Sequence, residues 1–157
     1  LDSPLHMTAG ELFEALGERG AKALISVLED LPEKLARSTP QDHEKATYAE
    51  KVTKEMGRID WTKDAKTLDA LIRGMYPNPG TYTFFRGKRV KIHRAEVSDG
   101  ESKEAPGTII STKDGLTIAC GRGALTISSL QPENHKRMAA GDFVNGYQVK
   151  VNDTFDC

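Results

Sequence analysis

Apolar residues recur at helical spacing over the first thirty positions of the chain. The segment "HMTAGELFEALGERGAKALISVLEDL" carries two apolar stripes whose members lie about 3.6 residues apart. Thr8 and Glu11 have the T-x-x-E spacing of a capping box, so a helix is predicted to begin at Thr8. Gly17 and Gly20 are predicted to break or bend the chain, and Pro32 to end a second helix. A helical pair of this size has too little core to stand alone, so its stripes are expected to pack against a partner.

Periodicity then disappears between residues 33 and 60, where the chain is polar and charged. We interpret residues 34–60 as a linker that crosses a surface. Its few apolar docking points would be Tyr48, Val52 and Ile59.

A third helix is predicted where apolar spacing resumes, with Thr62 as its cap and Asp64 in its first turn. The apolar side of this helix would consist of Leu68, Leu71 and Ile72. Trp61, the only tryptophan, falls just before the cap, where an apolar side chain can fold back on the first turn as a staple. We therefore expect Trp61 to be buried between the linker and the domain that follows.

After the turn "YPNPG" the pattern changes to an alternation with period two, which is typical of strands. Tyr82 and Phe84 lead to a turn at residues 86–88, and Val90 and Ile92 continue on a return strand.

Three more short strands are predicted after this hairpin, with turns at Asp114-Gly115 and at residues 121–123. The segment "RMAAGDFVNG" indicates a short helix before a last strand around Val149. About five short strands with turns every eight to twelve residues or so favour a small barrel of the OB kind. The predicted fold class is α+β: two N-terminal helices and a linker, then a helix followed by a small antiparallel OB-like β-barrel.

The formal net charge of −1 hides a basic middle between two acidic ends. Residues 1–50 contain 5 Lys and Arg against 10 Asp and Glu, residues 51–94 contain 11 against 4, and residues 95–157 contain 6 against 9. Such asymmetry indicates a polyanionic partner. No apolar run approaches the roughly 18 residues that a membrane span needs. Cys120 and Cys157 have no metal or redox spacing, so we interpret them as reduced thiols of a cytosolic protein.

The most basic segment is "RGKRVKIHR", residues 86–94, which has five Lys or Arg and no acidic residue. On a strand, Arg89, Lys91 and His93 would project from the face opposite the apolar side chains. Such a row can bind phosphates and give a salt-dependent affinity. The alternative interpretation is a solvated outer face. The neighbouring linker is also basic, which supports phosphate binding but leaves both interpretations open.

No catalytic constellation is evident in the sequence. The glycine-rich "GRGAL" lacks the GxGxxG spacing and a following helix, so it is interpreted as a hairpin turn. The histidines are too dispersed for a metal site. They are His6, His43, His93 and His135.

The order of these segments resembles the C-terminal half of methionyl-tRNA formyltransferase. The similar segments are "TAGELFEALGERGAKAL", "TYAEKVTKEMGRIDWTKDA", "LIRGMYPNPGTYT", "APGTI" and "LQPENHKRMAAGDFVNG". The resemblance implies that residues 1–33 are the closing helices of an N-terminal Rossmann-like catalytic domain. It also implies that residues 34–60 are the linker and that residues 61–157 form an OB-like C-terminal domain. The first residue is Leu1 rather than Met, which we expect of a piece of a longer protein.

Enzymes of this family transfer a formyl group from 10-formyltetrahydrofolate to the α-amino group of methionine on initiator tRNA. The family's catalytic and folate-binding residues lie upstream of Leu1. The resemblance therefore implies no catalytic, folate or metal site in this chain, which is expected to be inactive alone. Its expected partners are initiator methionyl-tRNA and its own catalytic domain, in the cytoplasm and without a membrane; its oligomeric state is left open.

The expected RNA-binding residues form a basic track along the linker and the strand, with two outer members near the C-terminus. They are Lys51, Lys54, Arg58, Arg86, Lys88, Arg89, Lys91, Arg94, Lys136 and Arg137. The alternative is a structural or dimerising domain of a sugar-nucleotide N-formyltransferase, in which the basic strand would be ordinary surface. A contiguous positive surface from linker to barrel would favour RNA, whereas interruption by Glu50, Glu55 or Asp69 would favour the alternative.

Overall fold

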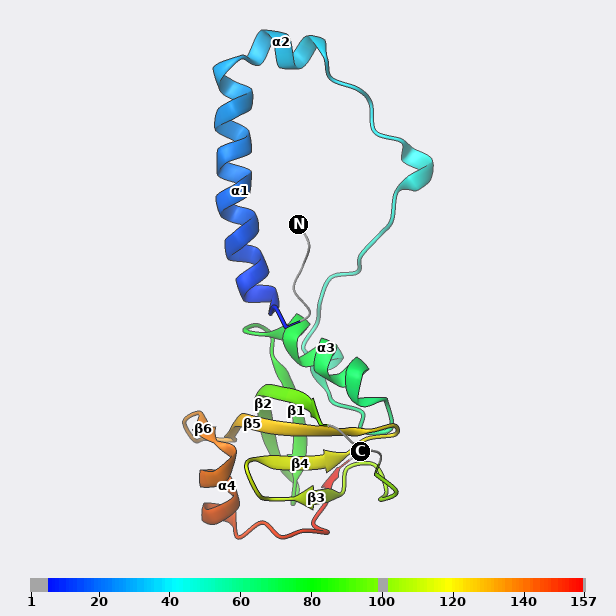
Figure 1. The fold of residues 1–157 in the computed structure, drawn as a ribbon, viewed down its shortest axis with the longest axis vertical. Helices are drawn as coiled ribbons and strands as arrows, with labels where there is room; N and C mark the ends of the chain where they lie inside the picture. Colours follow the sequence, from blue (N-terminus) through cyan, green and yellow to red (C-terminus); the bar gives the residue numbers. More distant parts are fainter. Residues whose placement is uncertain (1–5, 99–101, 157) are drawn as a thin grey trace. The chain divides into compact units, whose positions relative to one another are not determined.

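The computed structural model describes residues 6–98 and 102–156. Backbone contacts divide the chain into two units, Leu1–Val52 (unit 1) and Thr53–Cys157 (unit 2). Each unit is built around its own kind of element: unit 1 is helical and irregular, and unit 2 contains the sheet (Figure 1).

Unit 1 contains the helices α1 (Ala9–Glu29) and α2 (Leu31–Ala36) and the single turn η1 (His43–Lys45). The Thr8 hydroxyl accepts the Glu11 backbone N–H at 3.3 Å, and the Glu11 carboxylate accepts the Thr8 N–H at 2.8 Å. The predicted capping box and helix start are therefore confirmed.

The predicted boundaries of the two helices are wrong. Helix α1 continues through Gly17 and Gly20, because one glycine costs a helix only about 1 kcal/mol relative to alanine and the flanking residues are good helix formers. Pro32 lies in the first turn of α2 rather than at the end of a helix. A first-turn proline is tolerated there, since the N–H that it lacks would have no partner within the helix.

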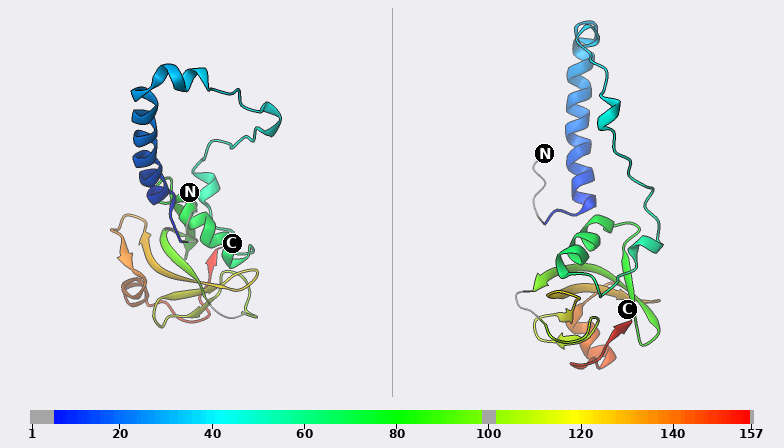
Figure 2. Two further views of the ribbon diagram at one scale, coloured as in Figure 1. Left: turned by 45° about the horizontal axis from the view of Figure 1, so that its top comes forward. Right: turned by 90° about the vertical axis from the view of Figure 1, so that its right-hand side faces the viewer.

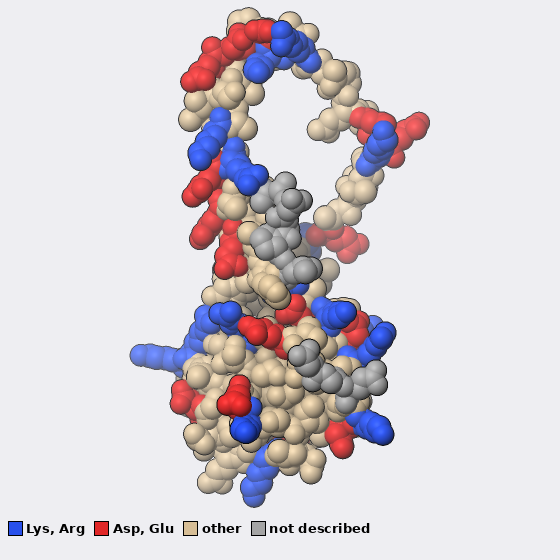
Figure 3. Space-filling model, in the orientation of Figure 1, with Lys and Arg blue, Asp and Glu red and all other residues tan. Residues whose placement is uncertain are grey.

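The apolar stripes of unit 1 are exposed, and neither α1 nor α2 contains a buried residue. The exposed large apolar side chains of these helices are Phe13, Leu16, Leu24, Ile25, Val27, Leu28, Leu31 and Leu35. In Figure 3 acidic side chains follow one flank of α1.

Of the three apolar residues that were expected to dock the linker, two are exposed and one is buried. Tyr48 is 96% exposed and Val52 is 53% exposed, so these two predictions are wrong. Ile59 is 1% exposed, as predicted. The reason is the backbone: the Ile59 N–H donates to the Tyr82 carbonyl at 2.8 Å and so joins the sheet, whereas Tyr48 and Val52 lie in a segment without regular structure.

Unit 2 is an antiparallel sheet that curls on itself (Figure 2). Its strands are β1 (Thr81–Phe85), β2 (Lys88–Ser98), β3 (Ile109–Ser111), β4 (Leu116–Ala119), β5 (Ala124–Pro132), β6 (Met138–Ala139) and β7 (Phe155–Asp156). The order across the sheet is β3-β4-β5-β2-β1-β7, and β6 pairs with β5. The strand predicted around Val149 is wrong: Val149 is buried, but its N–H donates to Val144 at the end of a helix, and the last strand is β7.

Backbone hydrogen bonds also join the two ends of this strand order. The Ile109 N–H donates to the Asp153 carbonyl at 2.8 Å, and the Phe155 N–H donates to the Gly107 carbonyl at 2.9 Å. The segment before β3 is therefore paired with the segment around β7, so both outer edges of the sheet have partners there.

Among its described residues, unit 2 also contains three helical elements: the turn η2 (Glu55–Gly57), α3 (Ala65–Met75) and α4 (Ala140–Tyr147). Helix α3 packs against β2, and α4 packs against β5. The cap of α3 is Asp64, whose carboxylate accepts the Thr67 N–H at 3.0 Å. The prediction of Thr62 as the cap is wrong, because the Thr62 hydroxyl and N–H are both bound to the Asp60 carboxylate in the preceding turn.

Trp61 lies at the centre of the core of unit 2 and is 0% exposed. Its indole N–H donates to the Thr83 hydroxyl at 3.0 Å, and its ring centroid lies 5.9 Å from that of Phe155. Its predicted burial is confirmed. Its predicted role as a staple is wrong, since the cap has moved to Asp64 and Trp61 packs on the sheet instead.

Candidate nucleic-acid interface

The β1–β2 hairpin places the apolar and the basic side chains of β2 on opposite faces, as predicted. Its two turn residues, Arg86 and Gly87, have positive φ values of 50° and 74°, the signature of a twisted two-residue turn. Along β2, Val90 is 2% exposed and faces the core, whereas Arg89 and Lys91 face outward and are exposed. The alternation therefore places two cations in a row on the outer face.

Two aromatic side chains of β1 lie on the same outer face, directly across from these cations. The register pairs Tyr82 with Lys91 and Phe84 with Arg89. The rings of Tyr82 and Phe84 meet edge to face, with centroids 5.9 Å apart and an interplanar angle of 87°. Such a pair is a rigid apolar surface between charged neighbours.

An arginine guanidinium lies over each of these two rings. The guanidinium of Arg58 lies 5.9 Å from the centroid of Phe84, and that of Arg89 lies 6.0 Å from the centroid of Tyr82. Both distances are within the range of a cation–π contact. We call Arg58, Phe84, Tyr82 and Arg89 the cation–aromatic row. The guanidinium of Arg89 lies over Tyr82 at the exposed outer face, where its N–H edges can reach phosphate.

The cationic surface continues along β2 to a polar cluster at β5 and β6. The His93 imidazole contacts the Gln131 amide at 3.1 Å and meets the Tyr76 ring edge to face at 6.3 Å. Arg137 donates to the Ser129 hydroxyl at 2.7 Å and to the Tyr76 hydroxyl at 3.1 Å.

Burial lowers the pKa of His93 below its ordinary value, although the hydrogen bond to Gln131 acts in the opposite direction. The charges of Arg137 and Lys91 lower this pKa further. Lys91 and Arg137 therefore both lie close enough to His93 for their charges to act on its imidazole.

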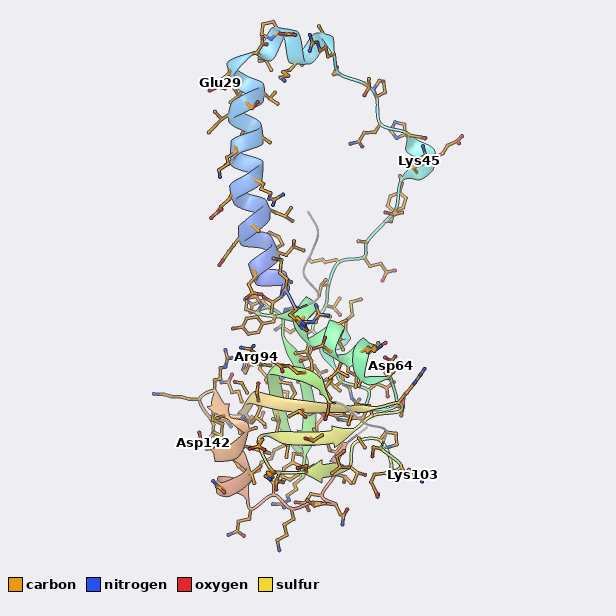
Figure 4. All side chains as sticks on the ribbon, in the orientation of Figure 1. Glu29, Lys45, Asp64, Arg94, Lys103 and Asp142 are labelled. Atoms are coloured by element: carbon orange, nitrogen blue, oxygen red, sulfur yellow. The ribbon has the colours of Figure 1, made fainter. Side chains whose placement is uncertain are left out.

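Other expected site residues have structural partners. Arg86 donates to the Tyr147 carbonyl and to the Asp153 carboxylate, both at 2.9 Å, and so ties the hairpin turn to the end of α4. Arg94 lies 3.6 Å from the Glu96 carboxylate (Arg94 is labelled in Figure 4).

The remaining expected site residues are exposed lysines: Lys51, Lys54, Lys88 and Lys136. Lys51 belongs to unit 1 and the other three belong to unit 2.

Acidic side chains lie among these cations. Asp69 is neutralised by Arg73 on α3 at 2.9 Å, and Glu50 and Glu55 are exposed. Glu133 lies beside Arg89 and Lys91 at a hollow of about 220 Å³. In Figure 3 basic side chains project from the margins of unit 2, with acidic side chains among them.

Tyr82 and Phe84 are residues of the candidate interface that sequence reasoning missed, because they were assigned only to a strand. The signal was present in the alternation: their outward positions face the outward positions of the basic strand across a two-residue turn.

Neither metal nor nucleophile chemistry is apparent in the described residues. Among them no group of three or more His, Cys, Asp or Glu could hold a metal ion. Burial, with a smaller contribution from Asp64, raises the pKa of the Cys120 thiol to about 12, so it stays protonated at neutral pH. Across residues 6–98 and 102–156, no helix is long and apolar enough to span a membrane.

Comparison with known proteins identifies a matching family and similar sequences for this chain. Residues 51–148 match the family described as formyl transferase, C-terminal domain. The chain is 42% identical over 151 residues to methionyl-tRNA formyltransferase of Bdellovibrio bacteriovorus, covering 94% of the chain and 48% of that protein. It is also 42% identical over 153 residues to the enzyme of Carboxydothermus hydrogenoformans, covering 96% of the chain and 49% of that protein. The chain therefore spans about half the length of these relatives.

Solved structures of HypX from Aquifex aeolicus share the fold. One variant superposes with a TM-score of 0.69 at 18% identity, covering 94% of this chain and 28% of HypX. The complex of HypX with tetrahydrofolic acid superposes with a TM-score of 0.62 at 18% identity, covering 84% of this chain and 24% of HypX.

Proposed function

This chain belongs to the formyl transferase C-terminal domain family, and we propose that it is the tRNA-holding half of a methionyl-tRNA formyltransferase. The whole enzyme would transfer formyl from 10-formyltetrahydrofolate to the α-amino group of initiator methionyl-tRNA, in the cytoplasm. The identities of 42% to enzymes of that name support this assignment. The catalytic and folate-binding residues would belong to the part of the relatives that this chain does not match.

The observation that carries the proposal is the cation–aromatic row together with Lys91. Arginines held on aromatic rings lose less conformational freedom on binding than free side chains do. Arg89 presents planar donors that match phosphate geometry. Lys91, next to Arg89 on the same face, adds a third exposed cation to this surface.

Within that enzyme, we assign residues 1–33 to the end of the catalytic domain, residues 34–60 to the linker and residues 61–157 to an OB-like C-terminal domain. The exposed apolar stripe of α1 and α2 supports the first assignment, because such a face is stable in water only when another surface covers it. The curled antiparallel sheet with joined edges supports the last one.

The proposed role is to bind and orient the RNA, not to perform the reaction. Formyl transfer needs a base that deprotonates the attacking amine and donors that stabilise the oxyanion. In the described residues the outer face offers cations, amides, rings and the Glu133 carboxylate, and the imidazole of His93 is held by Gln131. Phosphates that bind these cations release counterions, so the affinity would fall steeply with salt.

The test is binding of this chain to uncharged initiator tRNA, titrated across a series of salt concentrations. The proposal predicts binding at low salt and a steep linear decrease of the logarithm of the association constant with the logarithm of salt concentration. Absence of binding at low salt would contradict the proposal and favour a structural role for the domain.

A further inference from the structure

A polar hollow lies directly beside the cation–aromatic row. It is lined by Arg89, Lys91, Gln131, Pro132, Glu133 and Asn134, and its volume is about 220 Å³. Its lining is almost wholly polar, and Pro132 is its one apolar side chain. Such a surface suits a sugar and its phosphates better than the face of a base, which stacks on aromatic or apolar groups.

The side chain of Gln131 and the backbone of Glu133 are held by contacts within unit 2. The Gln131 amide contacts the His93 ring and donates to the His135 carbonyl at 2.7 Å, so the protein holds both ends of this amide in place. The Glu133 backbone N–H donates to the Arg89 carbonyl at 2.9 Å, which fixes the position of Glu133 at the end of β5.

The side chains of Glu133 and Asn134 are uncommitted. Neither makes a hydrogen bond or an ion pair with a described residue, and both are exposed. Glu133 shares the hollow with Arg89 and Lys91 but forms no ion pair with either. An ionised carboxylate accepts hydrogen bonds and does not donate them, so at a phosphate-binding surface it repels the backbone and needs a donor from the ligand.

The ribose 2′-hydroxyl is the donor that RNA has and DNA lacks. We propose that this hollow is a sugar-phosphate site in which Arg89 and Lys91 hold phosphates and Glu133, with Asn134, accepts the 2′-hydroxyl. The site then discriminates RNA from DNA at the level of one nucleotide, and Glu133 is its specificity residue. This inference rests on the proposed function, since it names what the same face recognises.

The test is the effect of Glu133→Ala on the binding of two hairpins of identical sequence, one of RNA and one of DNA, to the chain of residues 1–157. Removing the carboxylate removes a repulsive charge, so DNA affinity should rise about two-fold. RNA affinity should fall about five-fold, because the lost hydrogen bond outweighs the relieved repulsion. Glu133→Gln keeps an acceptor oxygen and should therefore retain most of the preference for RNA.

The opposite signs on the two hairpins distinguish the site from simple electrostatics. A rise in affinity for both hairpins, or equal binding of RNA and DNA by the unchanged chain, would overturn the inference and leave the proposed function intact. Absence of binding to any RNA at low salt would overturn the proposed function itself. Glu104→Ala removes an exposed carboxylate outside the hollow and serves as the control, with unchanged affinity expected for both hairpins.

Discussion

At the scale of single residues, similar side chains have different roles because of partners far away in the sequence. Arg86 and Arg89 both occur in the same basic segment. Arg86 is bound to Tyr147 and Asp153, more than sixty residues away, and stabilises the fold. Arg89 lies over Tyr82 and faces outward. The period-two pattern predicts that Arg89 faces outward, but it does not predict these distant partners.

Trp61 is the residue on which the stability of unit 2 should depend most. Trp61→Phe removes the indole N–H that donates to Thr83. It also leaves a cavity in the core, because the Trp61 side chain is 0% exposed. We expect the free energy of unfolding to fall by about 2–3 kcal/mol, measured by urea denaturation.

The matched control is Tyr48→Ala, at a side chain that is 96% exposed, which should change the free energy of unfolding by less than about 0.5 kcal/mol. Equal effects of the two substitutions would show that Trp61 is not a core residue.

His93 should make the stability depend on pH in a narrow range. Its pKa in the folded protein is lowered from 6.5, first by burial. The unfolded chain therefore binds the proton more readily, so the stabilising contribution is complete above about pH 6.5 and is lost as the pH falls through the lowered value.

The measurement is urea denaturation of the parent chain and of His93→Gln between about pH 8 and pH 5. The substitution should reduce the loss of stability over this interval, whereas His43→Gln, at an exposed position, should leave it unchanged. Identical pH profiles for the parent chain and His93→Gln would refute the role of His93.

At the scale of elements, several features that depend on adjacent residues were predicted correctly, whereas the pairing of distant segments was not. The Thr8 capping box, the hairpin at Arg86-Gly87 and the turn at Gly121-Arg122-Gly123 depend on a few adjacent residues, and all three are present. The cap of α3 and the position of β7 were predicted wrongly. The Asp64 cap depends on Thr67, three residues on, so the signal was local and Thr62 was the wrong choice between two candidate caps. In contrast, β7 pairs with β1, a strand seventy residues earlier, so no local pattern specifies β7.

The contact between the turn after β4 and the start of α3 should be sensitive to any side chain at Gly121. Its N–H donates to the carbonyls of Trp61 and Lys63 at 2.8 and 2.9 Å. A Cβ at this position would lie 1.8 Å from the Thr62 carbonyl oxygen, which is a backbone atom. Gly121→Ala should therefore destabilise unit 2 by about 3 kcal/mol.

Gly74→Ala gives the matched control, because a Cβ there meets nothing within 4 Å and the position lies in helix α3. This change should stabilise the protein by about 0.5–1 kcal/mol. Thermal denaturation of both variants should show shifts of opposite sign, and a shift of the same sign would contradict the packing described here.

At the scale of the whole molecule, the resemblance drawn from sequence segments is confirmed by the family match over residues 51–148 and by relatives that are 42% identical. The sequence also predicted the basic strand and its outward face. It did not predict the cation–aromatic row, because Arg58 reaches Phe84 only through the parallel bridge between Arg58 and Tyr82. The site therefore depends on an association of segments that are separate in the sequence.

The most direct test of the account is the salt dependence of initiator tRNA binding by the double variant Arg89→Ala/Lys91→Ala. Each lost phosphate contact should reduce the slope of the logarithm of the association constant against the logarithm of salt concentration by about one unit, so a reduction of about two is expected. The control is Lys103→Ala/Lys113→Ala, two exposed lysines outside the hollow and the cation–aromatic row, of which Lys103 is labelled well away from Arg94 in Figure 4. A reduced slope for the first variant alone would establish the outer face of β2 as the RNA-binding surface, and equal slopes for both variants and the parent chain would contradict it.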